Sequence, residues 1–337
     1  MSLDQVSVRI SENTHVSEAR RASSRIGQEL SFDPAAEGNL AIVTTELARN
    51  VLLHGGGGEV VLQPCKGPST STHVNVIALD RGPGITDISK VLHDGYSSIG
   101  TLGTGLGAVR RLATTFDFYT KPGGGTAILA RVAASPTEGA EDSQTTGSVC
   151  VPIAGETRCG DAWEHQDQSS RRLIMVADGL GHGIGAADAA EEALAAFRAN
   201  SHKSPKEIIE AAHDRLKKTR GAAVSVAELD FERQIIRYSG IGNIVGTIVA
   251  DGKSRNMISH NGIVGHASET IREFTFPWPR HAFLIMHSDG LTARWAFEQY
   301  QGLQLKPPSL IAAVLYRDFK RMRDDATVVV SREARAA

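Results

Sequence analysis

Cysteine is scarce in this sequence, with three among 337 residues. The three are widely spaced, at Cys65, Cys150 and Cys159, and they contain no Cys-x-x-Cys pair. They therefore support neither a disulfide framework nor a structural zinc site. The sequence also lacks any uncharged apolar run near the roughly 18 residues that a spanning helix needs. Because the N-terminus shows no basic start followed by an apolar stretch, we expect a cytoplasmic protein that is neither secreted nor membrane-inserted.

An excess of one charge is also missing. The chain holds 36 basic and 38 acidic residues, for a formal net charge of −2. No global positive field therefore favours nucleic acid as a partner. Apolar residues make up 41% of the chain, which is too many for a disordered protein and too few for a membrane protein. The length corresponds to two globular domains at roughly 100–200 residues per domain.

Glycine, by contrast, is abundant and clustered. It accounts for 34 of the 337 residues, about one in ten, against a usual share of roughly 7%. Residues 133–148 lack large apolar side chains and mix Pro, Gly, Ser, Thr and acidic residues, a composition typical of a linker. We predict a first domain at 1–132 with an α/β sandwich pattern. A second domain at 149–332 shows many strands with segregated helices, typical of a layered α+β fold, before a short tail at 333–337.

Three motifs in the first half combine polar side chains with glycine. Glu46 and Asn50 lie four residues apart in a predicted helix and share one side of it, although the pair taken alone is more simply explained as a polar helix flank. Asp80 ends an apolar strand and begins DRGPGI, which by itself is typical of a turn. The run GTLGTGLG at 100–107 opens a helix, where backbone N–H groups can hold phosphates. It matches neither a P-loop nor a dinucleotide fingerprint.

In this order, and followed by GGGT at 123–126, these motifs resemble the GHKL ATPase family of gyrase, Hsp90, histidine kinases and MutL. The stretches TELARNVLLHG, DRGPGI and DGYSSIGTLGTGLGAVRRL are similar in particular to the anti-sigma and stressosome serine kinases of the RsbT type. The resemblance implies a Bergerat-type α/β sandwich that binds ATP with Mg²⁺. It also implies a serine or threonine on a partner protein as the phosphate acceptor.

The same resemblance implies roles for individual residues. Glu46 would act as the general base, and Asn50 would ligate the Mg²⁺ on the phosphates. These residue types suit the roles, because a carboxylate can take a proton and an amide oxygen can ligate Mg²⁺ without adding charge. Asp80 would accept the adenine amino group. The remaining ATP-binding residues would be Gly82, Gly84, Gly103, Gly105, Gly107 and Thr126.

In the second half, aspartates recur beside small residues in the four stretches CGDAW, ADGLGHG, SDGL and RDDAT. One aspartate of this kind is most simply a turn residue at the end of a strand. Several converging carboxylates, however, would repel one another strongly unless a divalent cation neutralised them. An oxygen-rich set without His or Cys spacing suits Mg²⁺ or Mn²⁺ better than Zn²⁺.

This order of motifs resembles the PPM-type Ser/Thr phosphatases in their SpoIIE/RsbX branch. The resemblance implies an αββα sandwich with two Mn²⁺ or Mg²⁺ ions. Two further residues each have two possible roles. His182 is either a proton donor to the leaving seryl oxygen or a turn residue. Arg158 is either a residue that steers phosphate or a solvated charge. The implied metal ligands are Asp161, Asp178, Gly179 through its carbonyl, Asp289, Asp324, and Asp325 directly or through water.

Together the two resemblances predict a bifunctional partner-switching regulator. It would phosphorylate and dephosphorylate Ser or Thr on a STAS-domain antagonist in sigma-factor or stressosome-type signalling. A sigma factor or a downstream signalling enzyme is a further candidate partner. Two alternatives stay open, namely a phosphatase gated by a non-catalytic nucleotide- or partner-binding domain, and an anti-sigma binding protein.

Overall fold

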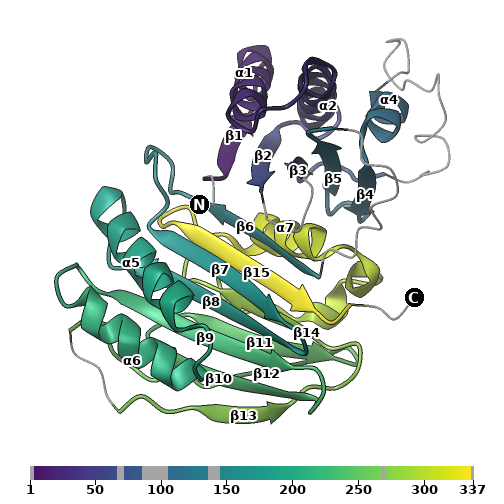
Figure 1. Ribbon diagram of the computed structural model, residues 1–337. Coiled ribbons are helices and arrows are strands. Elements are labelled where there is room, and N and C mark those ends of the chain that lie inside the picture. Colours follow the sequence, from purple (N-terminus) through teal and green to yellow (C-terminus); the bar gives the residue numbers. More distant parts are fainter. Residues whose placement is uncertain (1–3, 67–71, 86–104, 136–144, 267–269, 335–337) are drawn as a thin grey trace. The chain divides into compact units, whose positions relative to one another are not determined.

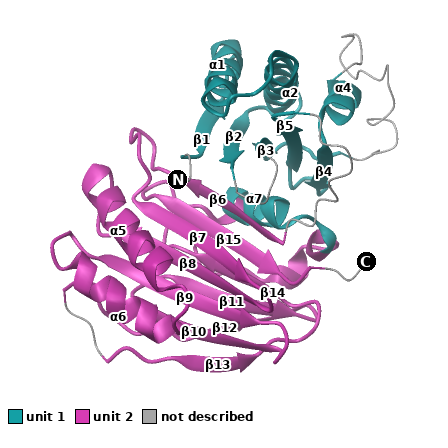
Figure 2. Ribbon diagram, viewed as in Figure 1, with its two compact units in different colours: residues 1–143, 305–317 teal, residues 144–304, 318–337 magenta. Residues whose placement is uncertain are grey.

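The computed structural model describes residues 4–66, 72–85, 105–135, 145–266 and 270–334 (Figure 1). The chain forms two compact units (Figure 2). The first comprises Met1–Ser143 and Leu305–Arg317, and the second comprises Gln144–Gln304 and Asp318–Ala337. One short segment that interrupts the second unit in sequence therefore belongs to the first unit.

The first unit is built on a five-stranded sheet whose strand order is β1-β2-β3-β5-β4. Every neighbouring pair in it is antiparallel. Helices α1, α2 and α4 contribute to a single core with one face of this sheet. The bounds are β1 (Val6–Ile10), α1 (Asn13–Glu29), α2 (Pro34–Leu53), β2 (Gly58–Cys65), β3 (His73–Asp80), α4 (Gly105–Leu112), β4 (Thr115–Thr120) and β5 (Thr126–Ala133).

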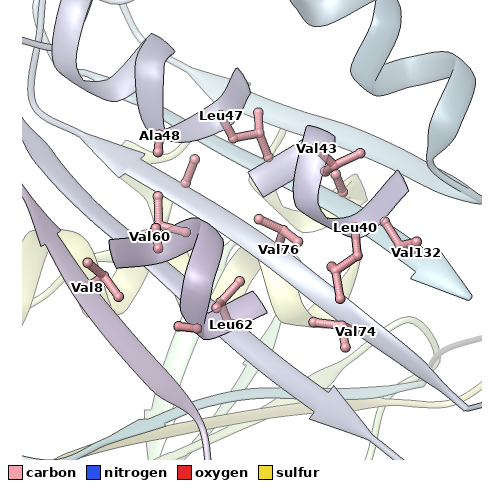
Figure 3. Close-up of a cluster of buried hydrophobic side chains, with 14 of the residues drawn as sticks. Val8, Leu40, Val43, Leu47, Ala48, Val60, Leu62, Val74, Val76 and Val132 are labelled. Atoms are coloured by element: carbon pink, nitrogen blue, oxygen red, sulfur yellow. The ribbon is translucent and has the colours of Figure 1, made fainter. Parts of the chain in front are cut away.

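Helix α2 is the central helix of this core. Its start is fixed by Asp33, whose side chain accepts hydrogen bonds from the backbone N–H groups of Ala35 and Ala36 at 2.9 and 2.8 Å. Along its length Leu40 and Leu47 are fully buried and pack against valines of the sheet (Figure 3). The same helix carries Glu46 and Asn50, so core packing sets the position of both polar side chains.

The opposite face of this sheet is buried as well. Val61 and Leu129 are 0% exposed, and they alternate along their strands with the residues that face α1 and α2. Glu59 lies on the same face as Val61, and its Oε1 accepts a hydrogen bond from the Tyr316 hydroxyl at 2.7 Å. Helix α7 (Pro308–Phe319) therefore contributes Tyr316 to the second face of the sheet in the first unit.

The second unit contains two five-stranded sheets, with strand orders β13-β10-β9-β8-β7 and β12-β11-β14-β15-β6. The sheets and helices have the following bounds: β6 (Thr146–Val151), β7 (Asp161–Gln168), β8 (Arg171–Gly179), α5 (Ile184–Asn200), α6 (Pro205–Leu216), β9 (Ala222–Asp230), β10 (Ile235–Ile241), β11 (Val245–Ala250), β12 (Lys253–Asn256), β13 (Phe274–Pro277), β14 (Phe283–His287), η1 (Phe297–Gln299), η2 (Leu303–Leu305) and β15 (Ala326–Arg332).

Alternation along β8 shows how these layers pack. Leu173 and Met175 join the core formed with α5 and α6, whereas Ile174 and Val176 join the core that includes Met286 of the other sheet. Successive side chains of a strand point to opposite faces, so β8 is buried on both sides. The second unit thus consists of a helical layer followed by two packed sheets.

The predicted domain limits stay predictions. Strand β6 begins at Thr146, inside the predicted linker, and residues 136–144 lie outside the described part of the chain. The segment Leu305–Arg317, which the sequence analysis assigns to the second domain, clusters with the first unit. None of the described helices combines the length and the apolar content that a membrane crossing requires.

The buried second face of the first sheet can be tested with Leu129→Ala. Removing a fully buried leucine side chain leaves a cavity, and we expect the unfolding free energy of the first unit to fall by roughly 2–5 kcal/mol. Ile42→Ala on α2, where the side chain is 48% exposed, serves as the control and should change stability by at most about 0.5 kcal/mol. Both variants are measured by urea unfolding, with circular dichroism as the signal. If both substitutions lowered the unfolding free energy by the same small amount, the second face of the sheet would not be buried.

Candidate functional sites

In the first unit, Glu46 and Asn50 of α2 face the start of α4. A Cβ atom on Gly105 would lie 3.5 Å from Glu46 Oε2 and 3.7 Å from Asn50 Oδ1, so both side chains reach the glycine that opens the helix. Glu46 also forms an ion pair with Arg49 at 3.5 Å. Among the described residues, the buried Nδ2 of Asn50 has no hydrogen-bond partner. An unpaired buried amide is costly and is typical of a ligand site.

Asp80 forms the second part of this site, at the end of β3. Its Oδ1 accepts hydrogen bonds from the backbone N–H groups of Gly82 and Thr126 at 2.8 and 3.1 Å. Burial raises the pKa of Asp80 above its ordinary value, although these two N–H groups and the Arg317 guanidinium lower it. The geometry orients the carboxyl group, and its other oxygen can accept a hydrogen bond from an amino group.

Close backbone approach explains several glycines around Asp80. Gly84 has a φ of +75°, and a Cβ atom there would lie 2.4 Å from the carbonyl oxygen of Lys121. At Gly55, in the turn that ends α2, a Cβ atom would lie 2.4 Å from Asp80 Cβ. The sequence analysis missed Gly55 as a site residue, although the run of four glycines at 55–58 was a signal. The turn after α2 therefore packs directly against Asp80.

The structure thus places the predicted ATP-site residues in two groups, one at the α2–α4 contact and one around Asp80. Gly105 and Gly107 begin α4, and Gly107 is buried. Thr126 begins β5, and its hydroxyl lies 3.2 Å from that of Thr120. The predicted phosphate-site residue Gly103 lies outside the described residues. The binding roles of all these residues remain predictions.

In the second unit, strand pairing brings the predicted metal ligands together. Asp161 opens β7 and lies opposite Asp178 at the end of β8. Asp289 follows β14 and Asp324 precedes β15, and these two strands are neighbours. The fully buried Ser288 donates a hydrogen bond to Asp161 Oδ2 at 2.6 Å, which connects the two sheets at this end.

Electrostatic interactions show that the carboxylates converge. Burial raises the pKa of Asp178 to about 9, with further increases from Asp161, Asp289, Asp324 and Asp325. Burial also raises the pKa of Asp161 to about 7, against the lowering effect of its hydrogen bond from Ser288.

The pKa of Asp324 is raised as well, first by burial and then by the charge of Asp289. Within the described residues, no basic side chain forms an ion pair with any of these aspartates. Apart from the effect of the His182 imidazole on Asp324, no cation of the described residues is shown to offset their mutual repulsion.

The donor chemistry of this cluster fits a hard divalent cation. Carboxylate oxygens and a backbone carbonyl such as that of Gly179 are the ligands that Mg²⁺ and Mn²⁺ prefer. In the part of the chain that is described, no three His, Cys, Asp or Glu side chains form a closed group that could hold a metal ion. The individual ligand assignments remain predictions.

Hydrogen bonds fix two carboxylates of the cluster, those of Asp325 and Asp289. Asp325 is 2% exposed, and its two carboxylate oxygens accept hydrogen bonds from the backbone N–H groups of Ile153 and Gly160, both at 2.8 Å. Asn243 donates a hydrogen bond to Asp289 Oδ2 at 2.7 Å. Asn243 was not predicted as a site residue, and the run Gly-Ile-Gly-Asn at the end of β10 was its local signal.

The two residues with open alternatives both have acidic partners. His182 Nδ1 lies 2.7 Å from Glu156 Oε1, and the imidazole also lowers the pKa of Asp324. Arg158 forms an ion pair with Asp188 at 3.1 Å. The position of His182 beside the carboxylate cluster suits a proton donor, whereas Arg158 is engaged by another carboxylate. Both roles remain predictions.

Two family patterns match separate parts of the chain. The pattern of the family described as Histidine kinase-like ATPase domain matches residues 10–131, and that of Stage II sporulation protein E (SpoIIE) matches residues 168–333. The chain is 36% identical over 127 residues to the Serine/threonine-protein kinase RsbT of Bacillus subtilis (strain 168), covering 38% of this chain and 95% of that relative. It is 25% identical over 138 residues to the Phosphoserine phosphatase RsbX of the same organism, covering 41% and 69%.

Solved structures share the fold of part of the chain. A structure described as "The bacterial stressosome: a modular system that has been adapted to control secondary messenger signaling" matches with a TM-score of 0.52 at 24% identity, over 56% of this chain and 98% of that one. The crystal structure of RsbX in complex with magnesium matches with a TM-score of 0.50 at 21% identity, over 55% and 92%. The predicted α+β fold, with a GHKL-type domain followed by a PPM-type domain, is confirmed.

The raised pKa values make the stability of the metal-free protein depend on pH. An unfolded aspartate has a pKa of roughly 3.9, so between that value and about 9 the folded chain binds more protons at Asp178 than the unfolded chain does. The free energy of unfolding must therefore fall as the pH rises. After chelation of divalent ions, we expect lower stability at pH 8.5 than at pH 5.5, and a smaller difference in Asp178→Asn.

The control is Asp214→Asn on α6, where an exposed carboxylate pairs with Lys217 and has a lowered pKa. Denaturant unfolding at the two pH values measures each variant. Stability that is equal at both pH values, or a pH difference that survives in Asp178→Asn, would contradict the electrostatic origin.

Proposed function

Because the chain belongs, through its first domain, to the family of the RsbT serine/threonine-protein kinase and carries a SpoIIE-type phosphatase domain after it, we propose that it is a bifunctional partner-switching regulator. The first domain transfers a phosphoryl group from ATP to serine or threonine of a partner protein. The second domain removes that group. The partner is a STAS-domain antagonist in sigma-factor or stressosome-type signalling, and both reactions take place in the cytoplasm.

The observation that carries the proposal is the convergence of unneutralised aspartates in the second unit. Asp178 and Asp161 have pKa values raised to about 9 and about 7 by burial and by neighbouring carboxylates. A fold keeps such a costly arrangement most simply where a cation binds. Phosphate-ester hydrolysis is among the slowest uncatalysed reactions, and a two-metal centre is suited to accelerate it.

In the phosphatase site, Asp161, Asp178, the Gly179 carbonyl, Asp289 and Asp324 would hold two Mn²⁺ or Mg²⁺ ions, with Asp325 as a direct or water-mediated ligand. Such ions, when bound, would supply an activated water and positive charge for phosphoryl transfer. Ser288 and Asn243 orient two of the carboxylates through hydrogen bonds of 2.6 and 2.7 Å. His182, paired with Glu156, donates a proton to the leaving seryl oxygen.

In the kinase site, Asp80 accepts the adenine amino group with its free carboxylate oxygen. Gly82 and Gly84 allow adenine to approach, and Thr126 supports it. The glycines at 103, 105 and 107 contact the phosphates at the start of α4, where the helix dipole favours negative charge. Asn50 ligates the Mg²⁺ that accompanies ATP, and Glu46 takes the proton of the attacking hydroxyl.

The choice of partner is supported by the relatives. RsbX is by name a phosphoserine phosphatase, and one similar fold comes from work on the bacterial stressosome. A phosphorylated protein is therefore the substrate class that suits both domains. A sigma factor or a downstream signalling enzyme is the proposed next partner in the switch.

Asp178→Asn tests the phosphatase centre. The substitution keeps the shape of the side chain but removes a charged metal ligand, so we expect Mn²⁺-dependent phosphate release from a phosphorylated STAS-domain protein to fall about 100-fold or more. Asp214→Asn is the matched control and should keep full activity. Undiminished phosphate release by Asp178→Asn would refute the assigned metal centre.

Glu46→Gln tests catalysis by the first domain. Loss of a general base should lower phosphoryl transfer from labelled ATP by about 10²- to 10⁴-fold while ATP binding is retained. Glu37→Gln, on the same helix, is the control. Asn50→Ala should weaken both ATP binding with Mg²⁺ and transfer. If wild-type protein binds ATP without turnover and ATP changes the phosphatase rate, the gating alternative holds and the kinase assignment is wrong.

A further inference from the structure

Arg220 lies next to residues 179–183, the loop that follows Asp178 in the proposed phosphatase site. It immediately precedes Gly221, which has a φ of +79° and begins the approach to β9. The Gly221 carbonyl accepts a hydrogen bond from the Leu180 backbone N–H at 3.0 Å. This bond holds the Arg220 backbone beside residues 179–183, the segment that follows the predicted ligand pair Asp178 and Gly179.

The guanidinium of Arg220 lies close to Gly181 of this segment and to Gly185 in the first turn of α5. A Cβ atom on Gly185 would lie 2.7 Å from Arg220 Nε and 2.8 Å from its Cζ. A Cβ atom on Gly181 would lie 3.4 Å from Nη1. Larger residues at 185 would force the arginine side chain away, so the glycine permits the guanidinium to lie at this place.

The same loop also contacts the carboxylate cluster. A Cβ atom on Gly160 would lie 2.5 Å from Asp325 Oδ2 and 3.4 Å from the Gly181 carbonyl oxygen. Gly160 directly precedes Asp161. Gly181 therefore has its carbonyl oxygen near Gly160, which contacts Asp325, and it has the Arg220 guanidinium near its Cα.

Unlike its neighbours, Arg220 is not neutralised by the protein. Arg198 pairs with Glu164 and Arg215 with Glu192, each at 2.7 Å. Within the described residues Arg220 has no ion pair and no hydrogen bond, and it is exposed. The nearby carboxylate of Glu156 is engaged by His182. The guanidinium thus has its donors available for a ligand, next to the loop that follows Asp178.

We propose that Arg220 is a substrate-binding residue that contacts the phosphoryl group of the phosphoserine or phosphothreonine substrate. A guanidinium presents a planar fork of N–H donors that matches two phosphate oxygens, which a carboxylate-rich site cannot do. Arg220 thereby fills the role for which the sequence suggested Arg158, whose guanidinium is bound to Asp188. This inference rests on the phosphatase activity under the proposed function.

The test compares Arg220→Ala and Arg220→Lys with Arg215→Ala, an exposed arginine five residues earlier on α6. Full-length protein is assayed with Mn²⁺ and a phosphoserine peptide. Loss of a charge-assisted contact should raise KM about 10- to 100-fold in Arg220→Ala, with the unfolding midpoint unchanged. Arg220→Lys keeps the charge without the fork, so its KM should be intermediate. Arg215→Ala should behave as wild type.

Binding is also measured without catalysis, by fluorescence anisotropy of the labelled phosphoserine peptide against its unphosphorylated form. If the wild-type protein binds the phosphopeptide through Arg220 but releases no phosphate, the proposed phosphatase function fails and the Arg220 assignment stands. An unchanged KM and an unchanged peptide affinity in Arg220→Ala would overturn the assignment. So would a lower kcat accompanied only by a lower unfolding midpoint, because that result indicates a purely structural role.

Discussion

Repulsion among like charges is the constraint on which the second unit depends. Strand pairing places Asp161 opposite Asp178 and brings Asp289 and Asp324 to the same end of the two sheets. Burial makes each additional negative charge there more costly, as the raised pKa of Asp178 shows. The surrounding residues orient the carboxylates with neutral donors and do not neutralise them. Such a site is well suited to take up external cations.

The first unit handles a buried carboxylate in a different way. Asp80 receives two backbone N–H groups on one oxygen, so its charge is stabilised by the turn that follows β3 and by the start of β5. This requires close backbone approach, and glycines at 55, 82 and 84 permit it. In the first site, glycines are therefore needed where two stretches of backbone approach closely. In the second unit, the glycine at 185 leaves room for the guanidinium of Arg220.

Much of the candidate sites could be predicted from local patterns. Glu46 and Asn50 share a helix, and each predicted metal aspartate lies beside small residues at the end of a strand or in a short loop. Such features depend on neighbours in sequence. Asn243, Ser288, Gly55 and Arg220 could not be assigned their contacts in this way, because each acts on a residue at least 25 positions away. Their importance depends on strand register and loop packing.

By itself the sequence determined the two families, the mixed α/β architecture and the order of the motifs, because periodicity, turn residues and motif spacing are local properties. Only the tertiary structure decided that Leu305–Arg317 completes the first unit. The reason is physical: the sheet of that unit is apolar on both faces, and burying the second face requires a layer that 1–132 does not contain. Likewise, tertiary packing decided that Arg158 is paired and Arg220 is not, since the partner of an arginine depends on which carboxylate the fold brings near.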